Sequence, residues 1–307
     1  MVARSAQTRH ESTLGRFARW ARNEGLVAHI IIIAVLFTLL VPLTWMVGTS
    51  FKDIKEYAEN SASLFPRWGR WSTVNYEFTI SSMEHLPIYM RNSFVLAFSV
   101  VAIQVFVASL AGYAFARLNF RWRDVIFLSF LVSMFIPRAG GLMALYELMN
   151  WLKLRNNLLG LILYFSAQLP TAVFIMRQSY LAVPHEIEEA ALIDGAGWFQ
   201  VFLRIATPVA SGGMIVIATL AFVHVWSDYL VTFTLIDKDT QMTMSVGIRK
   251  LLRMAYDMAL HPRFRGKFAG EASDTALLLM AAAPVIIFYA LLQRWFMRGL
   301  TEGAIKF

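Results

Sequence analysis

The chain has 307 residues, of which 58% are hydrophobic and 16% charged, and its formal net charge is +8. Soluble domains have about 45–50% apolar residues, so this composition indicates a membrane protein, whose basic residues are better explained by anionic lipid headgroups than by nucleic acid. Because the chain has no cysteine, disulfides, thiolate chemistry and cysteine metal sites are excluded.

A polar, arginine-rich arm, residues 1–26, precedes the first of six long apolar runs. Roughly 20 apolar residues cross a hydrocarbon core about 30 Å thick, and in lipid each segment must pair its own backbone groups. We therefore predict an all-α integral membrane protein with six transmembrane helices. The runs are Val27–Val47, Ser93–Arg117, Val125–Tyr146, Leu158–Met176, Gly212–Ile236 and Ala276–Met297.

The first run is too long for the apolar region of a cleaved signal peptide, and Trp45 and Met46 stand where small residues would mark cleavage. With the loop after it, the run makes up the segment 27–91. This loop carries Trp68 and Trp71, which suit either an aromatic belt at the membrane interface or a surface for a soluble partner. The two interpretations have similar weight.

The third run contains Pro137-Arg138 and a glycine pair, so we expect a kink or a break there. Short basic loops stay in the cytoplasm, so the arginines of the N-terminal arm and of the loop Arg117–Arg123 predict that both termini are inside. The loop 237–275 is also basic but is predicted to lie outside, because long loops follow the charge rule less strictly.

A polar segment, Pro184–Ala196, separates the fourth and fifth runs and has the pattern of a helix at the membrane face. Proline is favoured at the first helical position, carboxylates are favoured in the first turn, and Gly195 can end the helix. We predict a short surface helix, a turn and a second element that returns to the bilayer. The alternative is a solvated amphipathic linker. The carboxylates are those of Glu186, Glu188 and Glu189.

The same segment resembles the EAA loop of ABC importer permeases. The resemblance consists of Glu189-Ala190-Ala191, then Asp194-Gly195-Ala196, and then Ile205 and Pro208; Thr207 replaces the family's leucine. We place this loop at 180–210.

The core unit, 92–307, is similar to the carbohydrate branch of that family, and its end resembles the smaller maltose-type permease. Ser227 replaces the branch's asparagine, and Phe307 replaces its final glycine. The supporting stretches are Ala111–Arg117, Phe222–Tyr229 and Gln293–Lys306.

The resemblance implies a type I ABC importer permease with a cytoplasmic coupling helix, in the inner membrane of a prokaryotic cell. The implied partners are membrane lipid, a second homologous permease subunit, a dimer of ATPase subunits and an extracellular solute-binding protein, and the implied solute is a sugar or oligosaccharide. The chain lacks a phosphate-binding G-x-x-x-x-G-K-[ST] loop. We therefore expect no enzyme activity and no cofactor in this chain, with ATP and Mg used by the partner ATPase.

The matching family positions imply roles in coupling to the ATPase. Glu189 is expected to pair with an arginine of the ATPase, since a carboxylate–guanidinium pair is strong and directional, and the two alanines permit close approach. Asp194 is expected to cap or brace the next segment. The full coupling set is Glu188, Glu189, Ala190, Ala191, Asp194, Gly195 and Ala196, with Gly303 and Lys306 as a tail contact.

Polar residues inside the apolar runs are the candidates for a solute path, because a buried charge in lipid is costly unless it faces a cavity or a partner. For Asp228 the alternative is a position near the outer interface, in water, and for His224 a packed or hydrogen-bonded histidine. The candidates are Gln104, Gln168, His224, Trp226 and Asp228.

Two other classes of protein are possible. A self-sufficient secondary transporter or channel predicts internal repeats and several membrane acids, whereas this chain has one firm acid and no obvious repeat. An intramembrane enzyme predicts paired catalytic residues. Neither these pairs nor a metal-binding or nucleophile motif is evident in the sequence.

Overall fold

A computed structural model of the chain describes residues 26–136, 139–260 and 270–304. Its described secondary structure is helical apart from one isolated bridge between Lys52 and Trp71. The longest helices are α2 (Leu26–Ser50), α5 (Leu86–Arg117) and α16 (Gly270–Ala304). The predicted all-α class is thus confirmed for the described residues.

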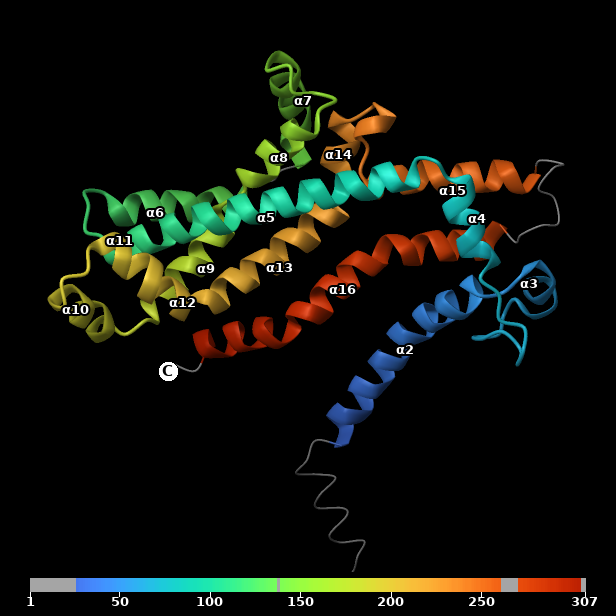
Figure 1. The fold of residues 1–307 in the computed structure, drawn as a ribbon, viewed down its shortest axis with the longest axis horizontal. Helices are drawn as coiled ribbons and strands as arrows, with labels where there is room; N and C mark the ends of the chain where they lie inside the picture. The colour runs from blue at the N-terminus through green and yellow to red at the C-terminus, as the bar shows by residue number, and fades with distance from the viewer. Residues whose placement is uncertain (1–25, 137–138, 261–269, 305–307) are drawn as a thin grey trace, which may run out of the picture.

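The bundle is built around α5, which packs along α8 (Leu158–Ser166), α9 (Pro170–Leu181) and α13 (Ser211–Ser227). Helix α16 lies against α13 and α2. The short helices α10 to α12 lie at one end of the bundle, and α3, α4 and α15 at the other (Figure 1). We call these the α10 end and the α3 end.

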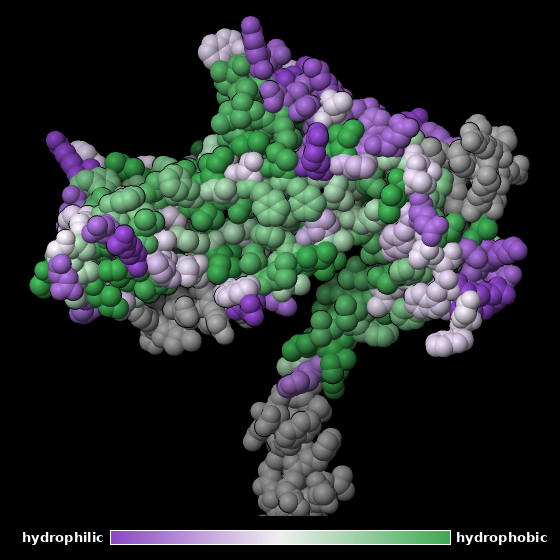
Figure 2. Space-filling view, viewed as in Figure 1, coloured by the Kyte–Doolittle hydropathy of each residue, from purple (hydrophilic) through white to green (hydrophobic). Residues whose placement is uncertain are grey.

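The lateral surface of the bundle is mostly hydrophobic, whereas hydrophilic residues gather toward its ends and on the projecting elements (Figure 2). Helix α2 is the extreme case, because none of its most apolar 18-residue window is buried within the chain. A soluble monomer rarely exposes an apolar surface of this extent. The surface therefore suits a hydrocarbon environment.

The six predicted spans are not confirmed as six helices. Within the described ranges, three helices are long and apolar enough to cross a membrane: Ala28–Ser50, Leu86–Arg117 and Gly270–Phe296. Two further spans result if each bent pair counts as one, Leu158–Ser166 with Pro170–Leu181 (46°) and Trp198–Val209 with Ser211–Ser227 (71°).

The third predicted run is not one helix. It divides into α6 (Arg123–Val132), the short 3-10 turns η1 (Ser133–Phe135) and η2 (Ala139–Gly141), and α7 (Leu142–Trp151). Pro137 and Arg138, where we expected a kink or a break, lie outside the described residues.

Other boundaries also differ from the prediction. The second span begins at Leu86 rather than Ser93 and the sixth at Gly270 rather than Ala276, while the fifth run is split into α13 and α14 (Leu230–Leu235). The loop 237–275 contains the 3-10 turn η4 (Asp239–Gln241) and α15 (Met244–Leu260).

The loop after α2 folds into a compact unit, residues 51–82, with α3 (Ile54–Asn60) and α4 (Val74–Ser82). We call it the outer knob. The side chain of Lys52 is fully buried in it, and its Nζ donates to the carbonyls of Asn60 (2.8 Å), Ser61 (3.2 Å) and Ser63 (2.8 Å). These three bonds use every proton of the ammonium group. Burial lowers the pKa of Lys52.

Candidate functional site

Helix α10 (His185–Ile193) occupies the segment between the fourth and fifth runs. It begins after Pro184, which takes the N-cap rather than the first helical position. It ends at Ile193, and Gly195, two residues further on, has a φ of +88°, which is favourable only for glycine. The N–H of Gly195 donates to Leu192 (3.1 Å) and that of Ala196 to Ala191 (3.0 Å), which is a Schellman motif. The predicted helix and its glycine end are confirmed.

Helix α10 has two different faces. One carries exposed residues at i, i+3, i+4 and i+7, and Ile193 on it is 86% exposed. The opposite face turns toward the bundle, with Ala191 and Leu192 partly buried and Glu188 buried. We call the exposed set the coupling face; it consists of Glu186, Glu189, Ala190 and Ile193.

The position of Glu188 corrects the prediction that its side chain belongs to the contact surface. Both of its carboxylate oxygens accept from Nε of Arg117, at 3.0 and 2.9 Å, and the two side chains are only 2% (Arg117) and 4% (Glu188) exposed. The same guanidinium donates from Nη2 to the carbonyl of Val183 (2.7 Å), and its Nη1 lies 3.2 Å from Nε2 of His185. Glu188 therefore anchors α10 to the end of α5.

The segment after α10 contains α11 (Trp198–Val201), the π-helix η3 (Phe202–Ala206) and α12 (Thr207–Val209). The N–H of Gly197 donates to the side-chain oxygen of Gln200 (3.2 Å), whereas among the described residues Asp194 makes no side-chain hydrogen bond. The bracing role predicted for Asp194 thus falls to Gln200. Thr207, which departs from the family's leucine, has its hydroxyl 3.2 Å from that of Tyr180.

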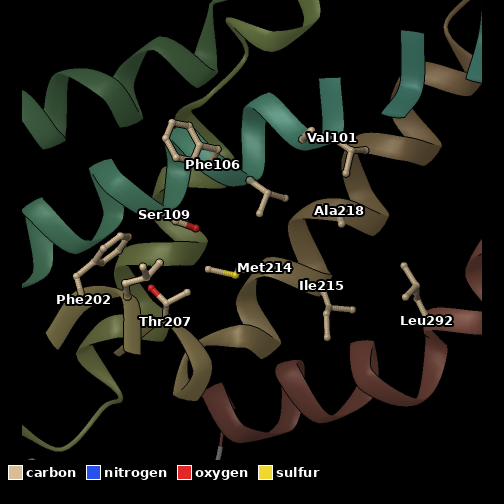
Figure 3. A pocket seen from close by; sticks show the side chains of 12 residues that line it. Val101, Phe106, Ser109, Phe202, Thr207, Met214, Ile215, Ala218 and Leu292 are labelled. Atoms are coloured by element: carbon tan, nitrogen blue, oxygen red, sulfur yellow. The ribbon is translucent and has the colours of Figure 1, made fainter. Parts of the chain in front are cut away.

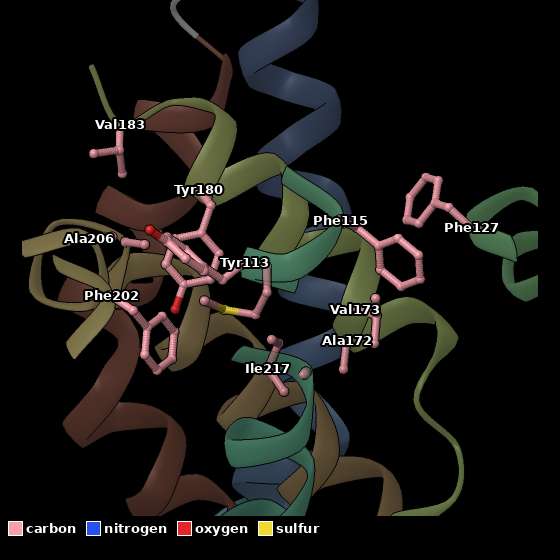
Figure 4. Close-up of a cluster of buried hydrophobic side chains, with 13 residues drawn as sticks. Tyr113, Phe115, Phe127, Ala172, Val173, Tyr180, Val183, Phe202, Ala206 and Ile217 are labelled. Carbon is pink, nitrogen blue, oxygen red and sulfur yellow. The ribbon is translucent and has the colours of Figure 1, made fainter. Parts of the chain in front are cut away.

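A cluster of buried aromatic and aliphatic side chains joins α5, α9, η3 and α13 (Figure 4). The ring of Tyr113 on α5 lies 5.2 Å from that of Tyr180 on α9 and 5.0 Å from that of Phe202 in η3. Close-packed interiors transmit displacement rather than absorb it. The cluster thus packs the end of α5 against α9 and η3, and η3 in turn contacts α10.

Three of the predicted polar residues meet at the break between α8 and α9. Gln104 on α5 donates from Nε2 to the carbonyls of Phe165 (2.7 Å) and Gln168 (3.3 Å). The Phe165 carbonyl also accepts from the backbone N–H of Gln168 (3.1 Å), so the side chain of Gln104 reinforces the turn at the break. Oε1 of Gln168 in turn lies 3.1 Å from Nε2 of His224 on α13. We call these three residues the polar cluster. Gln104 is buried, Gln168 half-buried and His224 exposed.

The other two predicted path residues are not part of this cluster. The carboxylate of Asp228 accepts from the backbone N–H (3.0 Å) and hydroxyl (3.2 Å) of Thr232, so it caps the first turn of α14. Trp226 is buried and donates to the carbonyl of Ala281 (3.1 Å). Both side chains have structural roles here.

Residues 104–302 match the model of the family described as "Binding-protein-dependent transport system inner membrane component". The chain belongs to this family. It is thus an inner-membrane permease component of a transport system and not an enzyme. Membership does not favour the alternative of a self-sufficient transporter.

Two curated relatives and one solved structure resemble this permease. The inner membrane ABC transporter permease protein YcjP of Escherichia coli (strain K12) is 31% identical over 273 residues, which cover 88% of this chain and 92% of YcjP. The maltodextrin transport system permease protein MdxG of Bacillus subtilis (strain 168) is 29% identical, with 78% and 82% covered. A chain of a bacterial ABC transporter involved in the import of the acidic polysaccharide alginate has the same fold, with a TM-score of 0.78, 20% identity, and coverage of 91% of this chain and 98% of that one.

The permease also has an apolar cavity of about 480 Å³ between α5, η3, α13 and α16 (Figure 3). Among the described residues that line it, the polar side-chain groups are the hydroxyls of Ser109 and Thr207. Binding sites for polar ligands need several well-placed hydrogen-bonding groups. This cavity therefore does not suit a hydroxyl-rich solute.

The remaining predicted site residues lie at the C-terminus. Gly303 belongs to the last turn of α16, and Lys306 lies outside the described residues. In the part of the permease that the structure describes, no three His, Asp or Glu side chains are grouped so that they could hold a metal ion.

Proposed function

We propose that this permease forms half of the translocation path of an ATP-driven importer for a sugar or oligosaccharide. The names of MdxG and of the alginate transporter support a carbohydrate as solute. In this proposal the permease works with a second permease subunit, an ATPase dimer that uses ATP and Mg, and an extracellular solute-binding protein.

The coupling face of α10 is the observation that carries the proposal. It presents Glu189 and Ala190 to solvent beside the apolar Ile193, while its opposite face is anchored. Within the described ranges the carboxylate of Glu189 has no hydrogen bond or ion pair. An exposed carboxylate next to small and apolar side chains suits a helix that enters a groove and pairs with an arginine there. We assign this groove to the ATPase.

The orientation follows from that assignment. An ATPase acts in the cytoplasm, so the α10 end and both termini of the chain are cytoplasmic, and the outer knob and α15 lie on the opposite side. The short basic loop Arg117–Arg123, which lies at the α10 end, supports this orientation under the positive-inside rule.

The polar cluster is our candidate for the solute path. Gln104 lies near the middle of α5, about 27 Å from Leu86 and about 20 Å from Arg117 along the helix, and therefore near the middle of the membrane. An exposed polar group at this depth faces water or a partner subunit rather than lipid. The half-buried amide of Gln168 and the exposed ring of His224 suit the hydroxyl groups of a sugar, while the buried Gln104 holds the break between α8 and α9 in place.

The first test is purification from native membranes in mild detergent. We expect an ATPase to copurify with the permease and Glu189→Arg to release it, because the substitution places a cation opposite the ATPase arginine. Asp124→Arg is the matched control, since Asp124 is an exposed carboxylate near the α10 end but outside α10. Transport in vesicles that contain no ATPase would overturn the proposal. Thermal-shift screening of the copurified binding protein with mono- and oligosaccharides tests the solute class.

A further inference from the structure

We infer that Arg117 is a positioning residue that clamps the coupling helix α10 to α5, so that both helices move as one body when the ATPase acts. This inference rests on the proposed function, because it takes α10 as the element that the ATPase displaces. The observation behind it is the buried guanidinium of Arg117, which bonds to three points on the chain around α10.

The three contacts of Arg117 fix both the start and the inner face of α10. Val183 precedes the helix, His185 is its first residue, and Glu188 lies one turn further along. Since arginine has donors and no acceptors, it donates to His185, whose Nε2 therefore accepts. A planar guanidinium can make these bonds in a fixed geometry, whereas the ammonium of lysine cannot reproduce it.

The clamp ties together elements that are far apart in the sequence. Arg117 ends α5, and Glu188 is 71 residues further along the chain. Almost no water reaches the pair, so the loss of one partner would leave an uncompensated charge in the protein. Such a contact restrains the position of one helix on another more strongly than an exposed ion pair does.

Helix α5 continues from the clamp into the membrane as a stiff unit. At Gly112 it lies so close to α9 that a Cβ atom would be 2.5 Å from Cβ of Met176. The same helix carries Gln104 of the polar cluster, while His224 of that cluster is on α13. A displacement of α10 would therefore move Gln104 with it and change its position relative to His224.

The other end of α10 lacks such a restraint. The chain leaves it through Gly195 and Gly197, and η3 follows with a π-helical segment, which is frequent at functional sites. One end of α10 is thus held on α5 by a buried ion pair, whereas the other end, in the part of the chain that the structure describes, reaches α13 through α11, η3 and α12 without one. Because only the α5 side is held by an ion pair among these residues, a displacement of α10 is passed to α5 more directly than to α13.

Spin-label distances test the clamp without a known solute, with AMP-PNP and Mg²⁺ as the probe of the copurified complex. The cysteine-free chain allows unique label pairs at the exposed residues Ile187 and Phe106 (α10 to α5) and Ile187 and Leu220 (α10 to α13). We expect the nucleotide to shift the α10–α13 distance and to leave the α10–α5 distance unchanged. With Arg117→Lys the α10–α5 distance distribution should broaden, and the nucleotide-driven shift of the α10–α13 distance should be reduced or lost.

Glu188→Gln is a second variant in case Arg117→Lys does not fold, and Arg123→Lys at an exposed ion pair is the matched control. If the α10–α5 distance shifts with nucleotide in the unsubstituted chain, the clamp is overturned. The same holds if both Arg117→Lys and Glu188→Gln behave like the wild type. If no ATPase copurifies, or if the nucleotide moves neither pair, the proposed function itself fails.

Discussion

The α10 end and the outer knob are each built around a buried charged side chain, but the two networks differ in reach. In the outer knob, Lys52 bonds to carbonyls only 8 to 11 residues away. At the α10 end, Arg117 bonds to residues 66 to 71 positions away, on other elements. A local network stabilises its own loop, whereas a long-range network makes separate helices depend on each other.

Breaking the Arg117–Glu188 pair should have the largest effect. Arg117→Met leaves Glu188 buried without its partner, which typically costs about 3–5 kcal/mol. We expect a marked fall in thermal stability, measured by unfolding in detergent, together with loss of nucleotide-driven movement.

The double variant Arg117→Met/Glu188→Leu separates stability from coupling. An apolar pair often replaces a buried ion pair without loss of stability, but it cannot bond to the carbonyl of Val183 or the ring of His185. Thermal stability should therefore recover, while the movement measured by the spin labels stays weak. Recovery of both would show that packing alone links α10 to α5.

Lys52→Met tests the local network and should have a smaller effect. The substitution keeps an apolar stem but leaves the carbonyl of Ser63 without a donor, and an unpaired buried group costs about 1–3 kcal/mol. The carbonyls of Asn60 and Ser61 keep a second donor each, Oγ of Ser63 (3.1 Å) and Nε1 of Trp45 (3.0 Å). Hydrogen exchange should rise in the outer knob, while the α10 end and ATP hydrolysis remain as in the wild type. Increased exchange in α10 would contradict the view that the Lys52 network acts only on its own loop.

The same contrast explains what could be predicted from the sequence. The start and the end of α10 follow from local signals, Pro184 and Gly195, which predict both. The inward position of Glu188 depends on Arg117, a residue on another helix, so local spacing could not separate its role from that of Glu189. Helical spacing does place residues 186, 189, 190 and 193 on one face. It therefore identifies the coupling face once one of them is known to be exposed.

Helix α15 is not predicted from the sequence, and the fifth span is predicted too long; these two errors have different causes. The sequence predicts a loop in place of α15 because Arg249, Lys250 and Arg253 dominate that segment, although Leu251 and Ala255 are buried and have helical spacing. It predicts one span over Gly212–Ile236 because a single acid, Asp228, hardly changes the apolar character of so long a run. The role of Asp228 as the cap of a new helix depends on its contact with Thr232, which composition does not reveal.

The smallest expected effect is a pH dependence confined to the outer knob. The side-chain amide of Asn60 and the backbone N–H of Arg67 donate to Glu56, and with the positive charges of Arg67 and Arg70 they lower its pKa below the ordinary value of 4.5. The native knob then binds fewer protons than the unfolded one, so its stability should be complete above about pH 4.5 and fall as the pH drops through the native pKa of Glu56. Hydrogen exchange between pH 7 and 3 should show lost protection in the knob before α10, and Glu56→Gln should remove this dependence. Simultaneous loss of protection in both regions would contradict the separation between the local and the long-range network.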